Sequence, residues 1–382
     1  MNILQLHNFY NIRGGEDEVV LAEKTMLEKS KHNIYTYYVN NSHLDSFIGK
    51  FKAVFVTHSS KQSQLSIAAL IKKYKIDVCH VHNFFPSITP SVFSVCQELN
   101  VPVVMTLHNY RIICPTALLL YKGNICERSL RQSAYWGVMK RVYRNSYIGS
   151  AVLAFMIEYH KKKDTWNTKV NKFICLTEFS KNKFIEAGVL ADLITVKPNS
   201  CQETTFQQVS TQEPFVLYVG RISEEKGIDV LLKACENFKG KVVVIGEGKP
   251  NTKPSNVDFM GKQSKEVVLA LMNQASFVVV PSICYEGFPM AIVEAFSCGT
   301  PVICSKLGSM EEIVDDNVTG LHFAPNDELD LRKKMHHLFN APQLIKELGS
   351  NAKLKYQKLY TEEKNIKALF RIYHELLESK VE

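Results

Sequence analysis

The residues best suited to chemistry lie in a short motif, Y-E-G-F-P-M-A-I-V-E-A, at residues 285–295. Its carboxylates, Glu286 and Glu294, have seven residues between them, so they need not contact the same group. Carboxylates accept hydrogen bonds from hydroxyl groups, which suits an acid at a polyol site. Glu294 has mostly apolar neighbours in sequence. A carboxylate in apolar surroundings needs a cation or a hydrogen-bond donor as its partner. Because Gly287 permits an unusual backbone angle and Pro289 suits a first helical turn, we expect backbone donors at a helix start.

Two cations follow one expected strand in the sequence G-R-I-S-E-E-K-G, residues 220–227. Arg221 offers a planar fork and Lys226 a point charge, and together they suit a diphosphate. The alternative is a pair of solvated surface cations beside Glu224 and Glu225.

A third motif, R-G-G-E-D at residues 13–17, stands between an expected strand and an expected helix that starts near Glu18. Gly14 and Gly15 let the backbone approach a phosphate at a helix N-terminus. A plain tight turn is the alternative, since neither G-x-G-x-x-G nor a Walker sequence is present.

Histidines lie in or directly after two expected strands. His108 comes directly after the strand at residues 101–107, at the carboxyl end where α/β sheets bind ligands, although it could instead make a structural hydrogen bond. Cys79, His80 and His82 have ligand chemistry, but side chains alternate along a strand, so only the two histidines share a face. We therefore predict no metal there.

These motifs need parallel sheets to position them. Short runs rich in Val, Ile and Phe alternate with helical patterns, which is typical of parallel sheets covered by helices. We predict strands at residues 3–6, 34–39, 53–57, 77–82, 101–107 and 172–176, and again at 215–219, 241–245, 257–260, 277–280, 301–304 and 320–323. The polar stretch 197–214 is the expected linker. Three helical patterns follow residue 327, and the last, 361–379, is amphipathic.

The composition is that of an ordinary globular protein. The 382 residues are 46% hydrophobic and 22% charged, which excludes disorder and suggests two domains with a ligand cleft between them. The start of the sequence lacks the pattern of a secretory signal and no apolar run could span a bilayer, so we expect a cytoplasmic protein. The ten cysteines form no C-x-x-C pair, which favours reduced, mostly buried thiols. Cys114 and Cys126 cannot form a zinc site unaided, so we expect none.

Positive charge gathers in residues 128–172, which hold ten Lys and Arg and only two acids, whereas the whole chain has a net charge of +8. This segment includes the apolar run 147–159, too short to span a bilayer but suited to an anionic membrane surface. A buried helix with solvated flanks is the alternative. No RNA-binding signature accompanies the patch, so we expect no nucleic-acid partner.

In this order, the three motifs resemble the retaining glycosyltransferases of family 4, over nearly the whole chain. The Glu-x7-Glu motif and G-R-x4-K-G carry the likeness, with V-H-N at 81–83, T-L-H-N-Y-R-I-I-C-P at 106–115 and L-T-E-F-S at 176–180. The set looks like a subgroup found among bacterial capsule, exopolysaccharide and lipopolysaccharide assembly enzymes. The resemblance implies the α/β GT-B fold, with two Rossmann-like domains facing across a cleft. It places an acceptor-binding domain at 1–198, a donor-binding domain at 199–360, and the helix 361–382 back on the first domain.

The resemblance also implies roles. Glu294 would hold the nucleotide ribose, Arg221 and Lys226 the donor diphosphate, and Glu286 the transferred sugar, which His108 would contact near its reacting carbon. Further donor contacts would come from Gly14, Gly15, Gly287, Phe288, Pro289 and Met290. The acceptor side would include Glu16, His82, Asn83 and Asn109.

The implied reaction transfers a sugar from a nucleotide diphosphate sugar to a hydroxyl with retention of configuration. We expect no cofactor and no metal, since cations and helix N-termini can stabilise the leaving diphosphate. The acceptor would be a lipid-linked glycan met at the inner face of the cell membrane. The alternatives are a nucleotide-sugar epimerase or hydrolase of the same fold, which needs no lipid acceptor, and a non-catalytic sugar-nucleotide-binding or scaffold protein.

Overall fold

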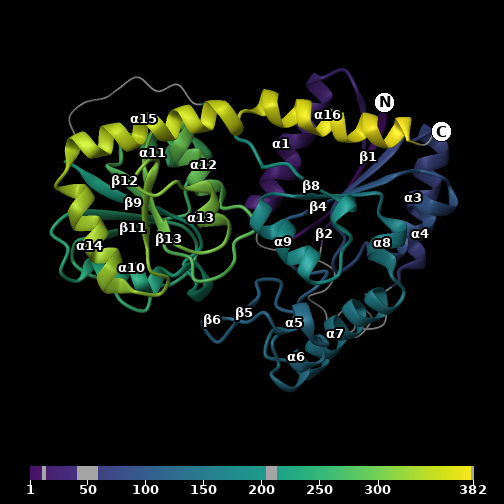
Figure 1. Ribbon diagram of the computed structural model, residues 1–382, viewed down its shortest axis with the longest axis horizontal. Coiled ribbons are helices and arrows are strands. Elements are labelled where there is room, and N and C mark those ends of the chain that lie inside the picture. Colours follow the sequence, from purple (N-terminus) through teal and green to yellow (C-terminus); the bar gives the residue numbers. More distant parts are fainter. Residues whose placement is uncertain (11–13, 41–58, 204–212, 380–382) are drawn as a thin grey trace. The chain divides into compact units, whose positions relative to one another are not determined.

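The computed structural model describes residues 1–10, 14–40, 59–203 and 213–379 (Figure 1). The expected strand at 53–57, Arg13 and the middle of the expected linker lie outside these residues. The chain divides into two compact units, Met1–Tyr121 with Cys126–Pro198 and Asn365–Glu382, and Lys122–Ile125 with Asn199–Lys364. We refer to them as the N-terminal and C-terminal units.

The N-terminal unit is built on a six-stranded parallel sheet with the order β2-β1-β3-β4-β7-β8. Its strands are β1 (Asn2–Phe9), β2 (Asn33–Asn40), β3 (Val78–Asn83), β4 (Val103–Leu107), β7 (Lys172–Cys175) and β8 (Ile194–Val196). A separate two-stranded pair consists of β5 (Leu120–Tyr121) and β6 (Asn124–Ile125). The helices are α1 (Gly15–Lys29), α3 (Lys61–Tyr74), α4 (Ser91–Glu98), α5 (Arg128–Arg131), α6 (Trp136–Met139), α7 (Tyr147–Lys162), α8 (Thr165–Lys169), α9 (Glu178–Glu186) and the 3-10 turn η2 (Ala191–Leu193).

The last helix of the chain, α16 (Glu362–Glu378), completes the N-terminal core. Leu369, Ile372, Tyr373 and Leu376 recur at helical spacing and form one apolar face. That face packs in a cluster with Ile3, Leu27, Val78, Val104 and Ile174 from α1 and four strands. The expected return of the C-terminal helix to the N-terminal domain is confirmed.

The C-terminal unit has a second six-stranded parallel sheet, ordered β11-β10-β9-β12-β13-β14. Its strands are β9 (Phe215–Val219), β10 (Lys241–Ile245), β11 (Val257–Gly261), β12 (Phe277–Val280), β13 (Val302–Ser305) and β14 (Gly320–Phe323). Its helices are η3 (Glu224–Lys226), α10 (Ile228–Cys235), α11 (Lys265–Gln274), α12 (Met290–Ser297), α13 (Ser309–Ile313), α14 (Glu328–Phe339) and α15 (Pro342–Leu359). The strand order reverses between β9 and β12, the kind of point where doubly wound sheets bind ligands.

Two Rossmann-like units with parallel sheets confirm the expected fold class. Strand β8 was not expected, because three residues carry too little pattern to stand out from a loop. Helix α1 begins at Gly15, three residues before the expected start. All ten cysteines are free and eight of them are buried, as the sequence indicates.

Candidate active site

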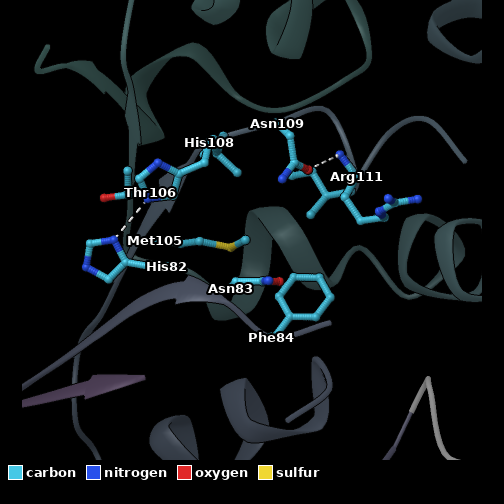
Figure 2. Close-up of a pocket in the computed structure, with 10 residues that line it drawn as sticks. His82, Asn83, Phe84, Met105, Thr106, His108, Asn109 and Arg111 are labelled. Carbon is cyan, nitrogen blue, oxygen red and sulfur yellow. Dashed lines mark hydrogen bonds between the residues drawn. The ribbon is translucent and has the colours of Figure 1, made fainter. Parts of the chain in front are cut away.

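In the N-terminal unit, a pocket forms where β3 and β4 end. Its lining includes His82, Asn83, His108, Asn109 and Arg111 (Figure 2). Because β3 and β4 are parallel neighbours, their carboxyl ends meet at one edge of the sheet. The structure thus brings together four residues that the sequence places in two separate motifs.

His82 and His108 contact each other at this edge. Nδ1 of His82 lies 3.0 Å from Nε2 of His108, and the rings stack with centroids 5.3 Å apart. Burial lowers the pKa of His82 to about 4 and holds the pKa of His108 well below its usual value. Both imidazoles are therefore neutral at pH 7, so they can donate and accept hydrogen bonds without carrying charge.

Behind His82 lies a carboxylate that sequence reasoning missed. Oε1 of Glu23 is 3.0 Å from Nε2 of His82 and 3.1 Å from Nδ1 of His80, and its Oε2 is 3.8 Å from Nζ of Lys197. Burial raises the pKa of Glu23, but the two histidines lower it further, and the net pKa is well below the usual value. A signal existed, because Glu23 shares the buried face of α1 with Val20 and Leu27.

The expected pairing of His80 with His82 on one face of β3 is confirmed, with ring centroids 4.2 Å apart. The ligand atoms of Glu23, His80 and His82 lie within 4.8 Å of one another, the one such group among the described residues. Nε2 of His80 lies 2.8 Å from Oγ1 of Thr106, and Nδ1 lies 2.7 Å from the hydroxyl of Tyr373. Hydrogen bonding between protein groups thus engages both nitrogens of His80.

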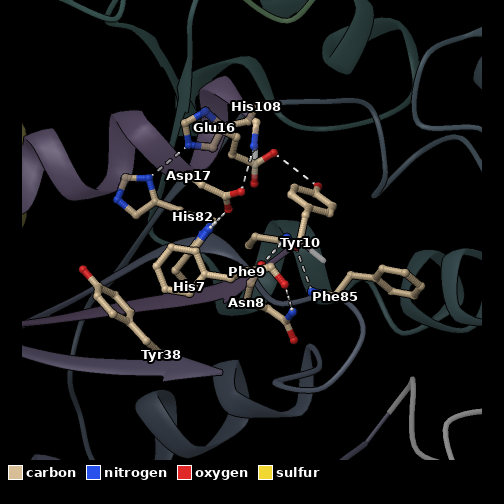
Figure 3. Close-up of polar contacts among 12 residues, drawn as sticks. His7, Asn8, Phe9, Tyr10, Glu16, Asp17, Tyr38, His82, Phe85 and His108 are labelled. Atoms are coloured by element: carbon tan, nitrogen blue, oxygen red, sulfur yellow. Dashed lines mark hydrogen bonds and ion pairs between the residues drawn. The ribbon is translucent and has the colours of Figure 1, made fainter. Parts of the chain in front are cut away.

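The glycine motif begins α1, and Figure 3 shows the contacts of Glu16 and Asp17 in its first turn. Gly14 caps the helix, and its N–H donates to Oδ2 of Asp17 at 3.0 Å, while Nε2 of His7 lies 2.7 Å from Oδ1 of the same carboxylate. The φ of Gly14 is −125°, and a Cβ there would meet nothing within 4 Å. Within this unit, neither backbone conformation nor packing requires a glycine at that position.

Glu16, in the first turn of α1, has a protonation state opposite to that of Glu23. Its Oε2 accepts hydrogen bonds from the Tyr10 hydroxyl at 3.2 Å and from Nδ2 of Asn109 at 3.3 Å, and its Oε1 is buried without a partner. Burial, reinforced by the charge of Asp17, raises the pKa of Glu16 to about 8. Glu16 is therefore mostly protonated at pH 7.

The two asparagines of the expected acceptor side stabilise loops. Nδ2 of Asn83 donates to the carbonyl of Asn8 at 2.8 Å, and its Oδ1 accepts from the N–H of Phe85. Oδ1 of Asn109 accepts from the N–H of Arg111 at 3.0 Å. Both side chains thus shape the loops around the pocket.

In the C-terminal unit, Lys226 and Glu286 form an ion pair. Nζ of Lys226 lies 2.6 Å from Oε1 of Glu286, which also accepts a hydrogen bond from Oγ of Ser282 at 2.6 Å. Burial opposes both charges, but the attraction between the two groups is larger, so the pKa of Lys226 is raised and that of Glu286 is lowered. Residues 60 positions apart in sequence thus present a fixed cation and a fixed anion.

Gly227 makes this pair possible. It has a φ of 67°, and a Cβ on it would lie 1.8 Å from the carbonyl oxygen of Pro281. Only glycine allows the loop after β9 to approach the end of β12 so closely. Arg221 has a different partner from Lys226. Its side chain is 57% exposed, and its guanidinium pairs with Glu225 at 3.0 Å.

Helix α12 carries the second carboxylate of the acidic motif. Glu294 is buried on it and pairs with Lys265 of α11, the partner that its apolar surroundings require. Glu286 and Glu294 therefore have separate partners, as their spacing indicates. Two details of the expectation were wrong: Pro289 is the N-cap rather than part of the first turn, and Gly287 is not among the residues with positive φ.

The remaining residues of the motif lie around the start of α12. Phe288 is buried, with its ring 6.0 Å from that of Tyr360, and Met290 is the first helical residue. The carbonyl of Gly287 accepts a hydrogen bond from Oγ of Ser309 at 3.3 Å. The motif therefore packs against α13 and the end of α15.

The basic segment 128–172 folds into α5 to α8 and exposes apolar side chains. Met139 is 76% exposed and Ile148 is 64% exposed. Tyr135, Tyr147, Phe155 and Tyr159 are also exposed. Among the described residues, no helix is both long enough and apolar enough to cross a membrane.

Comparisons with known proteins agree with this arrangement. Residues 202–355 match the family described as Glycosyl transferases group 1. An uncharacterized glycosyltransferase of Methanocaldococcus jannaschii is 28% identical over 80% of this chain and 78% of its own. A lipopolysaccharide 1,2-N-acetylglucosaminetransferase of Salmonella typhimurium is 31% identical over 40% of this chain, and the match spans about half (49%) of that relative.

Among solved structures, Anabaena HepE in complex with UDP-glucose has a TM-score of 0.67 at 18% identity, covering 99% of this chain and 100% of its own. The likeness shows the fold. The chain therefore has the GT-B fold, and its residues 202–355 match the group 1 glycosyltransferase family.

Proposed function

We propose that this protein is a retaining glycosyltransferase that moves a sugar from a nucleotide diphosphate sugar to a hydroxyl of a lipid-linked glycan in cell-surface polysaccharide biosynthesis. The observation that carries the proposal is the Lys226–Glu286 pair, which lies inside the matched residues, in the loops that follow the neighbouring strands β9 and β12. A partly buried cation beside a partly buried carboxylate can bind a diphosphate and an adjacent polyol at the same time.

In this proposal, Lys226 stabilises the negative charge that develops on the leaving diphosphate. Arg221 contributes from the same loop once it exchanges Glu225 for the phosphate, and the N-terminus of α12 adds backbone donors. Because these groups already supply positive charge, we propose that the reaction needs no metal ion.

The roles of the carboxylates follow from their surroundings. Glu286 is ionised and accepts hydrogen bonds from hydroxyls of the transferred sugar, with Ser282 and Lys226 fixing its orientation. Glu294 does the same for the ribose, and Lys265 is its ion-pair partner when no nucleotide is bound. His108 is neutral and contacts the sugar near its reacting carbon.

Relatives support the substrate classes. The Salmonella relative is named for transfer in lipopolysaccharide, and the Anabaena neighbour is described with UDP-glucose. These names favour a nucleotide sugar as donor and a surface glycan as acceptor for this chain.

The surface of α6 and α7 supports a membrane-bound acceptor. Lys161, Lys162 and Lys163 are exposed at the end of α7, and Met139 and Ile148 are exposed on the same two helices. Exposed apolar side chains beside cations are typical of helices that lie at anionic bilayers. We propose that this segment holds the protein at the inner face of the membrane.

The test combines binding and turnover. Purified protein is screened by thermal shift against nucleotides and nucleotide sugars, and the hit is assayed with a lipid-linked acceptor, with product configuration determined by NMR. We expect Lys226→Ala and Glu294→Gln each to weaken donor binding by about tenfold to a hundredfold. Lys262→Ala, which removes an exposed ion pair with Glu247 in the same unit, is the matched control and should bind normally.

Several outcomes would contradict the proposal. A product of inverted configuration excludes retention. Conversion of the donor into an isomer without acceptor shows an epimerase, and binding without turnover shows a non-catalytic protein.

A further inference from the structure

The buried groups behind His108 form a hydrogen-bonded chain that the proposed reaction does not use. Glu23 contacts His82, and His82 contacts His108, with 3.0 Å at each step. Of the three, only His108 is partly exposed, and it lines the pocket at the end of β4. A buried carboxylate is thus connected to the pocket through two imidazole rings, and Figure 3 shows the contact between these rings.

The carboxylate determines which nitrogens carry protons. An ionised Glu23 only accepts hydrogen bonds, so the nitrogen that faces it, Nε2 of His82, must carry a proton. Since His82 is neutral, its Nδ1 is then an acceptor. Nε2 of His108 faces that acceptor and must carry a proton in turn, which leaves Nδ1 of His108 with a free lone pair.

The neighbours of Glu23 support this order. The Tyr38 hydroxyl donates to Oε1 of Gln5, which turns the amide nitrogen of Gln5 toward Glu23, at 3.3 Å from Oε1. That nitrogen also lies 3.2 Å from Nε2 of His82, but the carboxylate is its acceptor. Nζ of Lys197 adds a positive charge 3.8 Å from Oε2 and keeps the carboxylate ionised.

The open end of the chain faces the pocket. Among the described residues, Nδ1 of His108 has no hydrogen-bond partner. An unprotonated ring nitrogen there can accept a hydrogen bond from a hydroxyl but cannot donate one to a phosphate or a ring oxygen. The tautomer of His108 therefore selects which group of a bound sugar the ring can contact.

We propose that Glu23 is a positioning residue that acts through His82 to hold His108 as the Nε2–H tautomer, so that its Nδ1 accepts a hydrogen bond from a hydroxyl of the transferred sugar. The sugar contact rests on the proposed function. The tautomer does not, because it follows from the three side chains alone.

The first test needs neither substrate nor variant of Glu23. Protein labelled with 15N-histidine is examined by long-range 1H–15N correlation, and the signals of His82 and His108 are assigned from His82→Asn and His108→Asn. We expect both rings to have a protonated Nε2 and an unprotonated Nδ1. A His108 ring protonated at Nδ1 overturns the proposal, whether or not the protein transfers sugar.

The second test is Glu23→Gln, which keeps the size of the side chain but removes the obligatory acceptor. We expect His108 to become a mixture of tautomers and kcat to fall about tenfold or more, with a smaller change in KM for the donor, since a misoriented group costs mainly the chemical step. Unchanged tautomers and kcat in a folded variant contradict the proposal. If the wild-type protein shows the expected tautomers but transfers no sugar, the proposed function is wrong and the assigned tautomer stands.

Tyr373→Phe is the matched control. It removes a hydroxyl 2.7 Å from Nδ1 of His80, which is not part of the chain from Glu23 to His108, and leaves His82 and His108 in place. We expect a loss of stability but a normal kcat and normal tautomers. Metal analysis completes the test: stoichiometric metal in the wild type that is lost in Glu23→Gln would show Nε2 of His82 to be a ligand, which also overturns the proposal.

Discussion

Three buried or partly buried carboxylates in this protein differ in protonation according to their partners. Glu23 and Glu286 each contact cations or histidines and stay ionised, whereas the Oε2 of Glu16 contacts a phenol and an amide, and its pKa rises to about 8. Burial opposes the charge in all three cases, so the partner decides the outcome. The same side chain can thus supply a fixed anion or a neutral group.

Glu16 gives a testable pH dependence. Its pKa is about 8 in the folded protein and close to 4.5 in the unfolded chain, so between these values the folded state holds a proton that the unfolded state has lost. Its contribution to stability is therefore greatest below pH 4.5 and is lost as the pH rises through 8. Relative to Glu16→Gln, the wild type should lose up to about 1.4 kcal/mol per pH unit over that range, measured by urea unfolding.

Glu18→Gln, in the same turn but exposed, is the control for this experiment. Its stability relative to the wild type should not change with pH in this window. If Glu16→Gln and the wild type follow the same pH profile, Glu16 is ionised at neutral pH and our assignment is wrong.

Sequence alone finds residues whose partners are close in sequence or whose motif is distinctive. It brought out Glu286, Glu294 and Lys226 from their spacing, and His108 from its place after a strand. It missed Glu23, because the partners of Glu23, His80 and His82, lie more than fifty residues away on β3. Contacts of this kind arise only when α1 packs on the sheet.

At the scale of elements, the strands were the easiest to predict, because fully buried parallel strands appear as short continuous apolar runs. Eleven of the twelve expected strands lie in described residues, and each matches one of the strands β1 to β4, β7 and β9 to β14. The β5–β6 pair was missed, since two residues per strand leave no pattern.

Helix α16 is the element on which the N-terminal core depends most clearly. Leu369 is fully buried among Ile3, Val78 and Val104, so Leu369→Ala leaves a cavity and should destabilise this unit by about 2–5 kcal/mol. Thermal or urea unfolding measures the loss. Leu354→Ala, at a position 62% exposed on α15, should be nearly neutral, and equal effects would show that α16 is not part of this core.

We predict that the end of helix α7 binds anionic membranes. Lys161, Lys162 and Lys163 are exposed at its end, and each basic residue near an anionic surface is worth about 1 kcal/mol. Changing all three to Glu should reduce co-sedimentation with anionic vesicles at low salt and slow transfer to a membrane-embedded acceptor, with nucleotide binding unchanged.

The control for α7 makes the same charge change in the C-terminal half, at the exposed Lys239, Lys333 and Lys358. It should sediment like the parent. Equal sedimentation of the α7 variant and the parent would instead identify the basic segment as a solvated surface.

At the scale of the whole molecule, the two halves share a sheet architecture but differ in charge. Residues 1–197 hold 25 Lys and Arg against 14 Asp and Glu, and residues 198–382 hold 21 against 24. The excess positive charge therefore belongs to the half that we propose meets the membrane and the acceptor. The half that contains the matched residues 202–355 is close to neutral.

The proposed independence from metal ions is tested on the whole molecule. In the proposed reaction Lys226, Arg221 and helix N-termini supply the positive charge at the leaving group, so we expect excess EDTA to change the turnover rate by less than about twofold. Turnover is measured with and without chelator. Complete inactivation that magnesium or manganese restores would exclude the metal-free reaction.

The position of α16 in the chain affects how the protein is made. Residues 1–198 leave the ribosome first, but the helix that covers their sheet follows the whole of residues 199–364. At a synthesis rate of about 5–20 residues per second, the apolar face around Ile3 and Val78 stays exposed for on the order of 10–30 s before α16 is made. The second half of the chain can therefore finish folding before the first, and the nascent N-terminal half is where chaperones would be needed.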